Sequence, residues 1–572
     1  MTDRDHHAIL DSVQPPSTSQ QPARVGPDGR IGSTYDVVVV GYGPVGTIVA
    51  AHLGRRGHRV LVVDRADAPY PLPRAVTHCS DVARILQSVG LSPDAVPDVT
   101  EPYDAMYVWT NGNDETLVEV DWSGLGESGW YNTYFFDQPS LERALDAVVA
   151  DLPHVDVVRG AEVTALDDGT DAVTVTIRRG GGSGDGGGNI EDVEVRAAFV
   201  VGADGARSTV RDLMDSGWHD EGYQHDWLVV DVEPGAGASV PTGATQRCDT
   251  DRPATMVPGG PGRRRWEFMR LPGEDPDALN TPDAAWSLLA PWGPTPDTAE
   301  LVRHSVYTFQ AGWAERWRRG RVVIAGDAAH LMPPFAGQGL GAGFRDAMNL
   351  TWKLDAVLRG VAAPALLDTY TPERQHHAHA FVDFSVSLGK VICITDPDEA
   401  AARDRRLQAE HRAGDRPRPP RPGLGPGLHV GEHGGVLSRQ GRVRTPSGTG
   451  RFDDVLDGPG ALLLRRAEDA PELSTRDRAD LAALRVTVVA LSADGPAAVV
   501  DDVAVIEDVA VIDDVDGTYT AWLDELGADV VLVRPDFHLY GTGTGDDAGA
   551  LVRGFLEGVR TGTCVRVGSS NV

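Results

Sequence analysis

Three closely spaced glycines early in the sequence form a pattern that binds dinucleotides. Gly41, Gly43 and Gly46 follow a short β-branched run, and Pro44 and Val45 lie where a helix is expected to begin. The first glycine makes a tight turn, the second lets the backbone approach a pyrophosphate, and the third lets helix and strand pack closely. The free N–H groups and the dipole of the helix then face the phosphates.

An acidic residue at the expected distance supports this interpretation. The runs 36–40 and 59–64 predict two buried strands, and residues 44–56 between them predict a helix. Asp64 ends the second strand, where its carboxylate can accept hydrogen bonds from the ribose hydroxyls of an adenosine. A glycine turn alone can merely join a strand to a helix. With these neighbours the unit predicts dinucleotide binding, but it does not distinguish a flavin from a nicotinamide dinucleotide.

A second stretch favours the flavin. Residues 321–327 predict a strand that ends in Gly-Asp, residues 328–339 form a loop rich in proline and glycine, and a helix is expected from Leu340. The Asp327 carboxylate suits a polyol chain, and loop N–H groups can reach a flat ring. The start of a helix favours negative charge, so it stabilises the reduced flavin, which is negative at its pyrimidine edge. The whole string therefore predicts the ring end of an FAD site.

The sequence also predicts the elements that must hold these two stretches in place. A long amphipathic helix is expected from about 339 to 358. Residues 180–189 form a glycine-rich connection, which we interpret as a hairpin loop. Further strands are expected at 156–158, 172–177, 199–202, 227–231 and 266–269, the last two inside a β-rich section at about 215–310, and at 484–490 and 530–533 near the C-terminus.

The length of 572 residues suits about three or four domain-sized units. Residues 1–34 are rich in Pro, Ser, Gln and Gly, which predicts a disordered tail. The Pro/Gly/Arg-rich stretch 411–428 predicts a linker, and a separate small domain is expected from about residue 446. Within that domain, we interpret the acidic near-repeat at 499–517 as a low-complexity insertion in a surface loop.

Charge and cysteine content exclude several classes of protein. The formal net charge is −32 and the isoelectric point about 4.8, so the chain repels nucleic acid and anionic membranes. No apolar run reaches the ~18 residues of a membrane helix, and the N-terminus lacks a signal-peptide pattern. The four cysteines lie far apart, without Cys-x-x-Cys or metal-ligand spacing. We therefore expect no metal site, no redox dithiol and a location in a reducing cytoplasm.

Three motifs together resemble the fingerprints of group A flavoprotein monooxygenases. They are GYGPVG at 41–46, GADGARSTVR at 202–211 and GRVVIAGDAAHLMPPFAGQGL at 320–340. The resemblance covers about residues 35–570 and is greatest to the 3-(3-hydroxyphenyl)propionate hydroxylase type. Shorter matching stretches lie at 72–76, 265–269, 346–354, 367–374 and 534–536.

The resemblance implies an α/β fold with two main parts. A Rossmann-like FAD domain (35–395) would be interleaved with a β-sheet substrate domain (about 100–130 and 215–310). A linker (396–445) would then lead to a thioredoxin-like α/β domain (446–572) that lacks redox cysteines. This implied organisation agrees with the cysteine-poor C-terminal part of the chain.

The resemblance also implies a set of FAD contacts. From the adenosine end to the ring end, these are Asp64 and Arg65 at the ribose, Arg74 and Gln138 at the pyrophosphate and ribityl region, Asp204 in a motif tied to FAD and to the nicotinamide step, Asp327 at the ribityl hydroxyls, and Pro334, Gly337, Gln338, Gly339 and Leu340 around the flavin ring. Without the resemblance, Arg74, Gln138 and Asp204 would be interpreted as ordinary surface or capping residues.

The sequence departs from these relatives in two places near the expected flavin. It has Thr-His-Cys-Ser-Asp at 77–81 where they have Gly-Ile-Asp-Asp-Glu, and Gly341 where they have Asn. His78 could act as an acid or base on the substrate side. The alternative is that His78 is only a packed, hydrogen-bonded polar group. Both departures concern the identity of the substrate more than the type of chemistry.

The expected reaction is hydroxylation of a phenolic small molecule. NADPH or NADH would visit without a nucleotide domain of its own and reduce FAD, and O2 would then form a flavin C4a-hydroperoxide that transfers one oxygen atom. Baeyer–Villiger oxidation or epoxidation in natural-product tailoring is the alternative with the same cofactor chemistry. A halogenase is disfavoured because no Trp-x-Trp-x-Ile-Pro stretch is present, and a non-catalytic flavin-binding protein is a further alternative. A homo-oligomer is compatible with the sequence.

Overall fold

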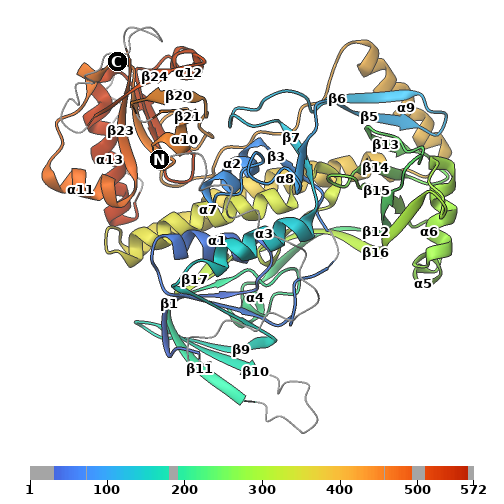
Figure 1. The fold of residues 1–572 in the computed structure, drawn as a ribbon, viewed down its shortest axis with the longest axis horizontal. Coiled ribbons are helices and arrows are strands. Elements are labelled where there is room, and N and C mark those ends of the chain that lie inside the picture. The colour runs from blue at the N-terminus through green and yellow to red at the C-terminus, as the bar shows by residue number, and fades with distance from the viewer. Residues whose placement is uncertain are drawn as a thin grey trace.

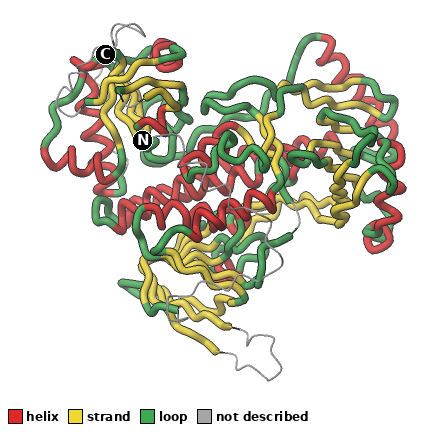
Figure 2. Tube along the Cα trace, viewed as in Figure 1, coloured by secondary structure: helices red, strands yellow, loops and turns green. Residues whose placement is uncertain are grey.

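The computed structural model describes residues 31–71, 74–179, 191–446, 448–456, 458–492 and 509–563. Most of the predicted N-terminal tail, the predicted hairpin loop at 180–189 and the first half of the acidic near-repeat lie outside the described residues. Figure 1 shows one sheet below a central band of helices, a second sheet at the right, and a separate C-terminal domain at the upper left. The band of helices therefore lies between these two sheets and the C-terminal domain (Figure 2).

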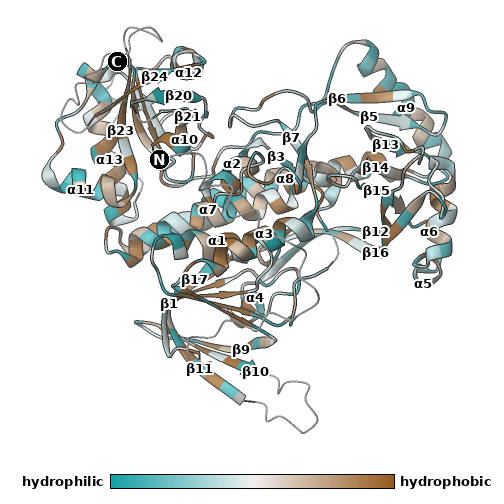
Figure 3. Ribbon diagram, in the orientation of Figure 1, coloured by the Kyte–Doolittle hydropathy of each residue, from teal (hydrophilic) through white to brown (hydrophobic). Residues whose placement is uncertain are grey.

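The first sheet contains the two stretches that the sequence singles out. The run of four valines makes the second half of β1 a buried part of a central strand, which pairs in parallel with β2 and β11, and β11 pairs in parallel with β18. Parallel strands buried on both faces read as continuous hydrophobic runs, as the brown colouring around β1 shows (Figure 3). In pairing order the strands are β17 Arg318–Arg319, β18 Val322–Ile324, β11 Glu191–Gly202, β1 Thr34–Val40, β2 Val60–Asp64 and β8 Val155–Arg159, with β10 Val173–Arg179 on β11 and β9 Ala161–Asp168 on β10.

Two helices that begin at the predicted motifs pack directly against each other. Helix α1 spans Pro44–Arg55 and helix α7 spans Gly339–Leu358, which confirms both predicted helices. A Cβ atom on Gly343 would lie 2.6 Å from Cγ2 of Val45, so glycine allows this close approach. Helix α3 (Gln138–Ala150) packs against α1 within the central band (Figure 1).

The second sheet is mostly antiparallel and lies in the section predicted to be β-rich. The predicted strands at 227–231 and 266–269 lie inside β12 and β15, and two short helices, α5 Pro276–Leu279 and α6 Pro282–Leu289, lie between β15 and β16. In pairing order its strands are β19 His330–Leu331, β16 Ala299–Ala314, β12 Trp218–Pro234, β15 Arg264–Met269, β14 Ala254–Pro258, β13 Ala244–Cys248, β5 Met106–Asn111 and β6 Thr116–Asp121.

Shorter elements connect the two sheets. A three-stranded sheet, β3-β7-β4, lies beside helix α2, and helix α4 follows β11. Two 3-10 turns, η3 and η4, precede α7 in the ring-end stretch. The bounds are β3 Thr77–Cys79, α2 Ser80–Ser88, β4 Thr100–Pro102, β7 Thr133–Phe136, α4 Thr209–Leu213, η3 Gly326–Ala328 and η4 Pro334–Ala336.

The segment predicted as a linker contains a helix. After the long helix α8 (Tyr370–Ile392), helix α9 spans Pro397–Arg412 and packs on β6. The Asp396 side chain caps α9 by accepting hydrogen bonds from the backbone N–H groups of Asp398 and Glu399, and Pro397 occupies the first turn. The sequence contains these start signals of α9, but the neighbouring Pro/Gly/Arg-rich stretch favoured a linker over a helix.

The C-terminal domain is built on a seven-stranded sheet that begins within the predicted linker. In pairing order its strands are β21 Gly448–Arg451, β20 Arg442–Thr445, β24 Ala510–Asp514, β23 Val486–Leu491, β22 Gly460–Leu464, β25 Val530–Val533 and β26 Leu539–Gly543, and its helices are α10 Phe452–Val455, α11 Thr475–Ala483, α12 Thr518–Leu526 and α13 Ala548–Thr561. The described part of the acidic near-repeat therefore contains strand β24 of the sheet and is not a surface loop. Side chains alternate between the two faces of a strand, and this alternation buries Ile512, which is 1% exposed.

No single helix among the described residues is long and apolar enough to cross a membrane. The bent pair formed by 364–392 and 397–412 passes that test by length and composition only, with an angle of 116° between its parts. Glu373 and Arg374 on this pair are fully buried and ion-paired inside the protein.

Candidate active site

The glycine turn after β1 has the geometry that the motif predicts. Gly41 has φ +101°, a conformation that favours glycine, and a Cβ atom there would overlap the backbone of Ala203. A Cβ atom on Gly46 would overlap the carbonyl oxygen of Gly41. Both glycines are thus required by backbone packing in the turn.

Gly43 differs from the other two glycines because it faces open space. A Cβ atom on Gly43 would meet no protein atom within 4 Å. Gly43 is also the N-cap of α1, and no side chain caps this helix, so its first N–H groups remain available to a ligand. The turn forms one end of a cavity of about 250 Å³. Its walls include Asp64, Arg65, Arg74, Asp204 and Gly205.

Asp64 stands at the end of β2 and holds the turn. Its Oδ2 accepts a hydrogen bond from the Tyr42 N–H at 2.6 Å, and its Oδ1 accepts one from the Ala66 N–H at 2.7 Å. The carboxylate is half-buried and lines the cavity, so further lone pairs can reach a ribose hydroxyl. Arg65 is exposed on the same wall.

Gln138 supports the cavity indirectly, because its side chain binds the backbone of a loop that lines the cavity. Its side chain is 3% exposed, and its Oε1 accepts from the N–H groups of Arg74 at 3.0 Å and Ala75 at 2.6 Å. Its amide donates to Glu142 at 2.6 Å. The structure therefore places Gln138 behind the loop that presents the exposed Arg74, where it fixes that loop, and does not place it on the cavity wall itself.

Asp204 has a similar supporting position at the end of β11. Its carboxylate accepts hydrogen bonds from the Ser208 hydroxyl at 2.5 Å and the Val210 N–H at 3.1 Å. Burial raises the pKa of this carboxyl above its ordinary value. Asp204 lines the cavity and, together with Gly205 (φ +81°), shapes the turn before α4.

The ring-end stretch lies directly beside the nucleotide turn. Gly326 has φ +62°, and a Cβ atom there would lie 2.9 Å from Cγ2 of Val45, which follows the glycine turn. The strand before it, β18, is separated from β1 only by β11. Asp327 follows Gly326 and is exposed. The two sequence stretches, far apart along the chain, therefore lie close together in the fold, where Gly326 meets Val45.

A buried carboxylate that the sequence did not identify as functional fixes the ring-end stretch. Asp346 on α7 is fully buried, and its Oδ2 accepts from the Gly326 N–H at 3.0 Å and from His330 Nε2 at 2.7 Å. Its Oδ1 accepts from Arg374 Nε at 2.9 Å. The position of Asp346 two turns into a predicted helix gave no signal of this role, which depends on the fold.

The loop before α7 presents backbone N–H groups at the start of a 20-residue helix. Gly337 has φ +64°, and a Cβ atom there would lie 2.6 Å from Cγ2 of Thr77. Gln338 precedes the helix without capping it through its side chain, so the first N–H groups, including those of Gly339 and Leu340, stay available. Pro334 begins the η4 turn in the same loop and is exposed.

The two segments in which the sequence departs from the relatives, residues 77–81 and Gly341, lie next to each other in the structure. A Cβ atom on Gly341 would be 3.2 Å from Val82 and 3.3 Å from the guanidinium of Arg345. Arg345 forms a buried ion pair with Asp81 and a contact of 3.0 Å with the Cys79 sulfur. A side chain at position 341 would therefore press on Val82 and Arg345, which would have to shift by a few tenths of an ångström.

The structure places His78 on the side of β3 that faces away from the ring-end loop. Side chains alternate along β3, so Thr77 and Cys79 face the ring-end loop and His78 points to the opposite side. His78 is 3% exposed, stacks on Tyr134 with ring centroids 5.0 Å apart, and hydrogen-bonds Thr100 Oγ1 at 3.2 Å. It lines neither of the two cavities described in this section.

The buried position of His78 predicts an acid-sensitive fold. Burial lowers the pKa of His78 from 6.5 to about 4, so the folded state binds fewer protons than the unfolded state between these values. The contribution of His78 to stability is complete above pH 6.5 and is lost as the pH falls towards 4. We expect His78→Gln to lower stability at pH 7.5 but to flatten its decline between pH 6.5 and 5, as measured by denaturant midpoints. A parallel decline in variant and wild type, with altered turnover instead, would contradict this assignment.

A second cavity lies between the second sheet and the ring-end loop. It has a volume of about 250 Å³ and is lined by Phe335 and Ala336 of that loop. Tyr107 and Trp109 project from one face of β5, and Trp122 stacks on Tyr107 with ring centroids 4.4 Å apart. The opposite wall comes from α8 and α9 and includes Phe384, Leu388, Val391 and Leu407.

The two cavities differ in character, and of the two only the second is lined by residues of the ring-end stretch. One is polar, contains uncapped helix N–H groups and suits a phosphate-containing ligand. The other is walled by aromatic and aliphatic side chains and suits a flat apolar molecule. Within the described residues, no group of three or more His, Cys, Asp or Glu side chains could hold a metal ion.

Comparisons with known proteins agree with this geometry. The profile of a family described as FAD binding domain matches residues 34–385, and that of the HcaD C-terminal domain matches residues 435–558. A probable NADH-specific resorcinol 4-hydroxylase of Rhodococcus jostii is 35% identical over 90% of this chain and 93% of that protein. A 3-(3-hydroxy-phenyl)propionate/3-hydroxycinnamic acid hydroxylase of Burkholderia cenocepacia is 34% identical over 87% of this chain and 92% of that protein.

Solved structures show the same fold. An anhydrotetracycline hydroxylase from Streptomyces rimosus superimposes with a TM-score of 0.68 and 25% identity, over 93% of this chain and 100% of that chain. Aklavinone-11 hydroxylase in complex with FAD and aklavinone gives a TM-score of 0.70 at 24% identity, over 92% of this chain and 98% of that chain.

Proposed function

Because the chain belongs to the FAD-binding monooxygenase family and is an FAD-dependent aromatic hydroxylase, we propose that it uses NADH and O2 to hydroxylate a phenolic small molecule. The observation that carries the proposal is the contact between the two halves of the site. Gly326 packs against Val45, so the ring-end stretch lies next to the glycine turn that lines the polar cavity. We infer that these two parts together form a groove for one extended ligand, as a dinucleotide with a flat ring at one end requires.

The residues of the groove fit FAD. Gly43 leaves space that a Cβ atom would fill, and the N–H groups of α1 face that space, as a pyrophosphate requires. Asp64 and Arg65 would hold the adenosine ribose, Arg74 the pyrophosphate region and Asp327 the ribityl hydroxyls. When bound, FAD supplies hydride acceptance and the activation of oxygen.

The protein's own contribution is binding and orientation. The N–H groups at the start of α7 would stabilise negative charge at the edge of a bound flavin ring. Phe335 and Ala336 belong to the loop that would hold this ring and also line the second cavity, so a substrate ring there would lie next to the flavin. The aromatic walls would surround that substrate ring.

Substrate-dependent oxidation of NADH tests the proposal. Purified protein loaded with FAD should be yellow and should oxidise NADH faster when a phenol such as resorcinol is added. Mass spectrometry with labelled O2 should show one labelled hydroxyl group on the product. Oxidation that no phenol in a broad panel accelerates, or a product with oxygen inserted into a ring bond, would overturn the proposed reaction.

Gly43→Ala should weaken FAD binding without affecting the fold. Gly43 has φ −80°, which alanine adopts freely, and the added methyl group meets no protein atom. It would occupy the space next to the pyrophosphate, so we expect at least about tenfold weaker binding, or ~1.4 kcal/mol. Flavin fluorescence titration measures this, and the melting temperature of the FAD-free protein should stay unchanged. Wild-type affinity for FAD would contradict the proposed position of the pyrophosphate.

We propose that the C-terminal domain is thioredoxin-like and has a structural role. The order β23-β22-β25-β26, with the first pair parallel and the others antiparallel, together with α11, α12 and α13, supports this assignment. Its described residues contain no cysteine. We also propose a cytoplasmic location, because the three described cysteines, Cys79, Cys248 and Cys393, carry free thiols.

A further inference from the structure

The charges around the second cavity restrict the substrate further than its aromatic walls do. Three charged side chains line this cavity, Arg406, Glu410 and Asp415, and together they carry one positive and two negative charges. The other lining residues are apolar or aromatic apart from His411. We propose, on the basis of the proposed function, that the substrate is a neutral phenol with an apolar substituent, rather than a phenol that carries a carboxylate.

The single arginine of this cavity is already paired. Arg406 and Glu410 lie one turn apart on α9, and Arg406 Nη1 donates to both carboxylate oxygens of Glu410, at 3.1 and 3.2 Å. Asp415 adds a negative charge at the same rim. The Arg406 and Glu410 side chains are 54% and 43% exposed, so this pair lies at the open rim, and a substrate carboxylate deeper in the cavity would lose its hydration without a cation beside it.

Two other buried cations of the same sheet lie outside this cavity. Arg265 on β15 forms a bidentate ion pair with Asp231, at 2.7 and 2.9 Å. Arg303 on β16 lies 3.6 Å from the same carboxylate and over the ring of Tyr307, and its Nε and Nη1 have no hydrogen-bond partner among the described residues. Because neither arginine lines the second cavity, neither can pair with a carboxylate held inside it.

The size of the cavity indicates the apolar substituent. A cavity of about 150 Å³ is enough for benzene, whereas this one measures about 250 Å³. With the reacting ring against Phe335 and Ala336, the remaining space lies between Trp122 and the wall formed by α8 and α9. Leu407 is 8% exposed and belongs to the apolar cluster of that wall. An alkyl group of a few carbons would fill this space.

A comparison of three probes tests the inference on the holoenzyme. Resorcinol is small and neutral, 4-hexylresorcinol is neutral with an apolar tail, and 3-(3-hydroxyphenyl)propionate carries a carboxylate. We expect kcat/KM for product formation to be highest for 4-hexylresorcinol and at least about tenfold lower for the carboxylate probe than for resorcinol. Equal or better turnover of the carboxylate probe would overturn the inference on charge, and rejection of 4-hexylresorcinol would overturn the inference on the substituent. If no phenol is turned over, the proposed function itself fails, which is a distinct outcome.

Two variants tie the selectivity to the named residues. Glu410→Gln removes the partner of Arg406, so the kcat/KM ratio of the carboxylate probe to resorcinol should rise about threefold or more. The matched control Glu399→Gln, exposed on the first turn of α9 and outside the cavity, should leave that ratio unchanged.

Leu407→Trp narrows the cavity and should lower the kcat/KM ratio of 4-hexylresorcinol to resorcinol at least tenfold, whereas Leu407→Met preserves the volume and should not. Unchanged ratios in both test variants would contradict the assignment.

Discussion

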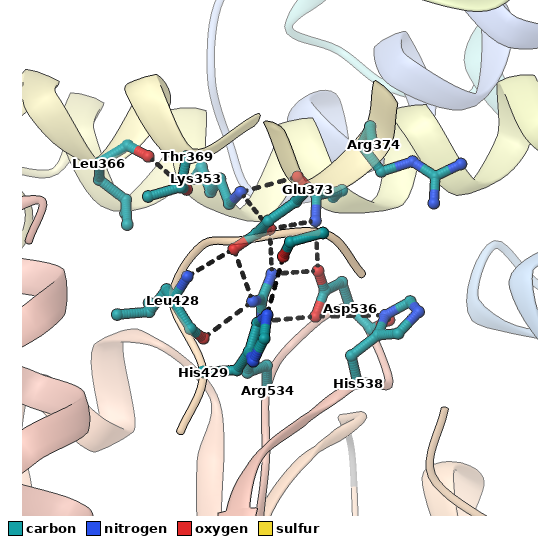
Figure 4. A network of polar contacts seen from close by, with 12 residues as sticks. Lys353, Leu366, Thr369, Glu373, Arg374, Leu428, His429, Arg534, Asp536 and His538 are labelled. Atoms are coloured by element: carbon teal, nitrogen blue, oxygen red, sulfur yellow. Dashed lines mark hydrogen bonds and ion pairs between the residues drawn. The ribbon is translucent and has the colours of Figure 1, made fainter. Parts of the chain in front are cut away.

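Replacing Arg534 with methionine should destabilise the protein by about 3–5 kcal/mol, the usual cost of removing one partner from a buried ion pair. Arg534 is fully buried at the junction of the C-terminal domain with α8, as Figure 4 shows. It donates two hydrogen bonds to the Glu373 carboxylate, at 2.9 and 2.8 Å, and two to the Asp536 carboxylate, at 3.1 and 2.7 Å. The nearby guanidinium holds the pKa of both carboxyl groups well below its usual range. Without Arg534, two buried carboxylates lose their main cation.

The melting temperature measures this loss. A change of this size should lower it by on the order of 10 °C. Arg442→Met is the matched control, because Arg442 belongs to the same domain and pairs with Asp516 at 2.7 Å, but its side chain is 61% exposed. An exposed pair contributes about 1 kcal/mol or less. Equal effects of the two variants would show that the buried network does not hold the domains together.

Gly46→Ala should abolish FAD binding under ordinary assay conditions. The added methyl group would overlap the carbonyl oxygen of Gly41 inside the turn, and neither atom belongs to a flexible side chain. The turn must open, which displaces the N–H groups of α1 that face the groove. We expect affinity to fall at least about 100-fold, or ~2.7 kcal/mol.

The flavin-to-protein ratio after purification and a fluorescence titration both measure this effect. Gly57→Ala is the control, because Gly57 also has positive φ (+83°) but a Cβ atom there would meet no protein atom within 4 Å. That variant should lose on the order of 1 kcal/mol of stability and keep its FAD. A yellow, fully loaded Gly46→Ala protein would exclude the proposed role of the turn.

The sequence predicted those parts of the site whose signals lie within a few neighbouring residues. The glycine turn at 41–46 combines a valine run, glycine spacing and a helix start within a few residues, and the structure has that turn. Helix α7 was predicted at its observed bounds because its start signals and its apolar periodicity agree. In both cases the determining interactions lie within one or two turns of the chain.

The face that a side chain presents could not be predicted in the same way. His78 and its neighbours Thr77 and Cys79 belong to a three-residue strand, whose orientation depends on its pairing with β7. A shift of one residue would have exchanged the faces. The sequence identified the right segment, but only the pairing shows that Thr77 and Cys79 face the loop.

Residues whose roles depend on distant partners were also missed. Asp346 carries no local signal, and its role arises because Gly326, His330 and Arg374 converge on it from other elements. The stretches at 367–374 and 534–536 resembled relatives without an evident function. The structure brings Glu373 and Arg534 together from these stretches, across the junction of two domains.

The buried network between the domains also restricts how this chain could have been shortened during evolution. Lys353 on α7 and Glu373 on α8 are 0% exposed, and the C-terminal domain supplies Arg534 and Asp536 as their cover and partners. A truncated gene product ending before residue 435 would leave the ion pair of Lys353 and Glu373 open to water on the two helices that hold the ring-end loop. Loss of the domain would also expose Trp352 and Ala356 of α7, which pack in the apolar cluster of that domain, so a chain shortened in this way would need polar replacements on that face of the helix.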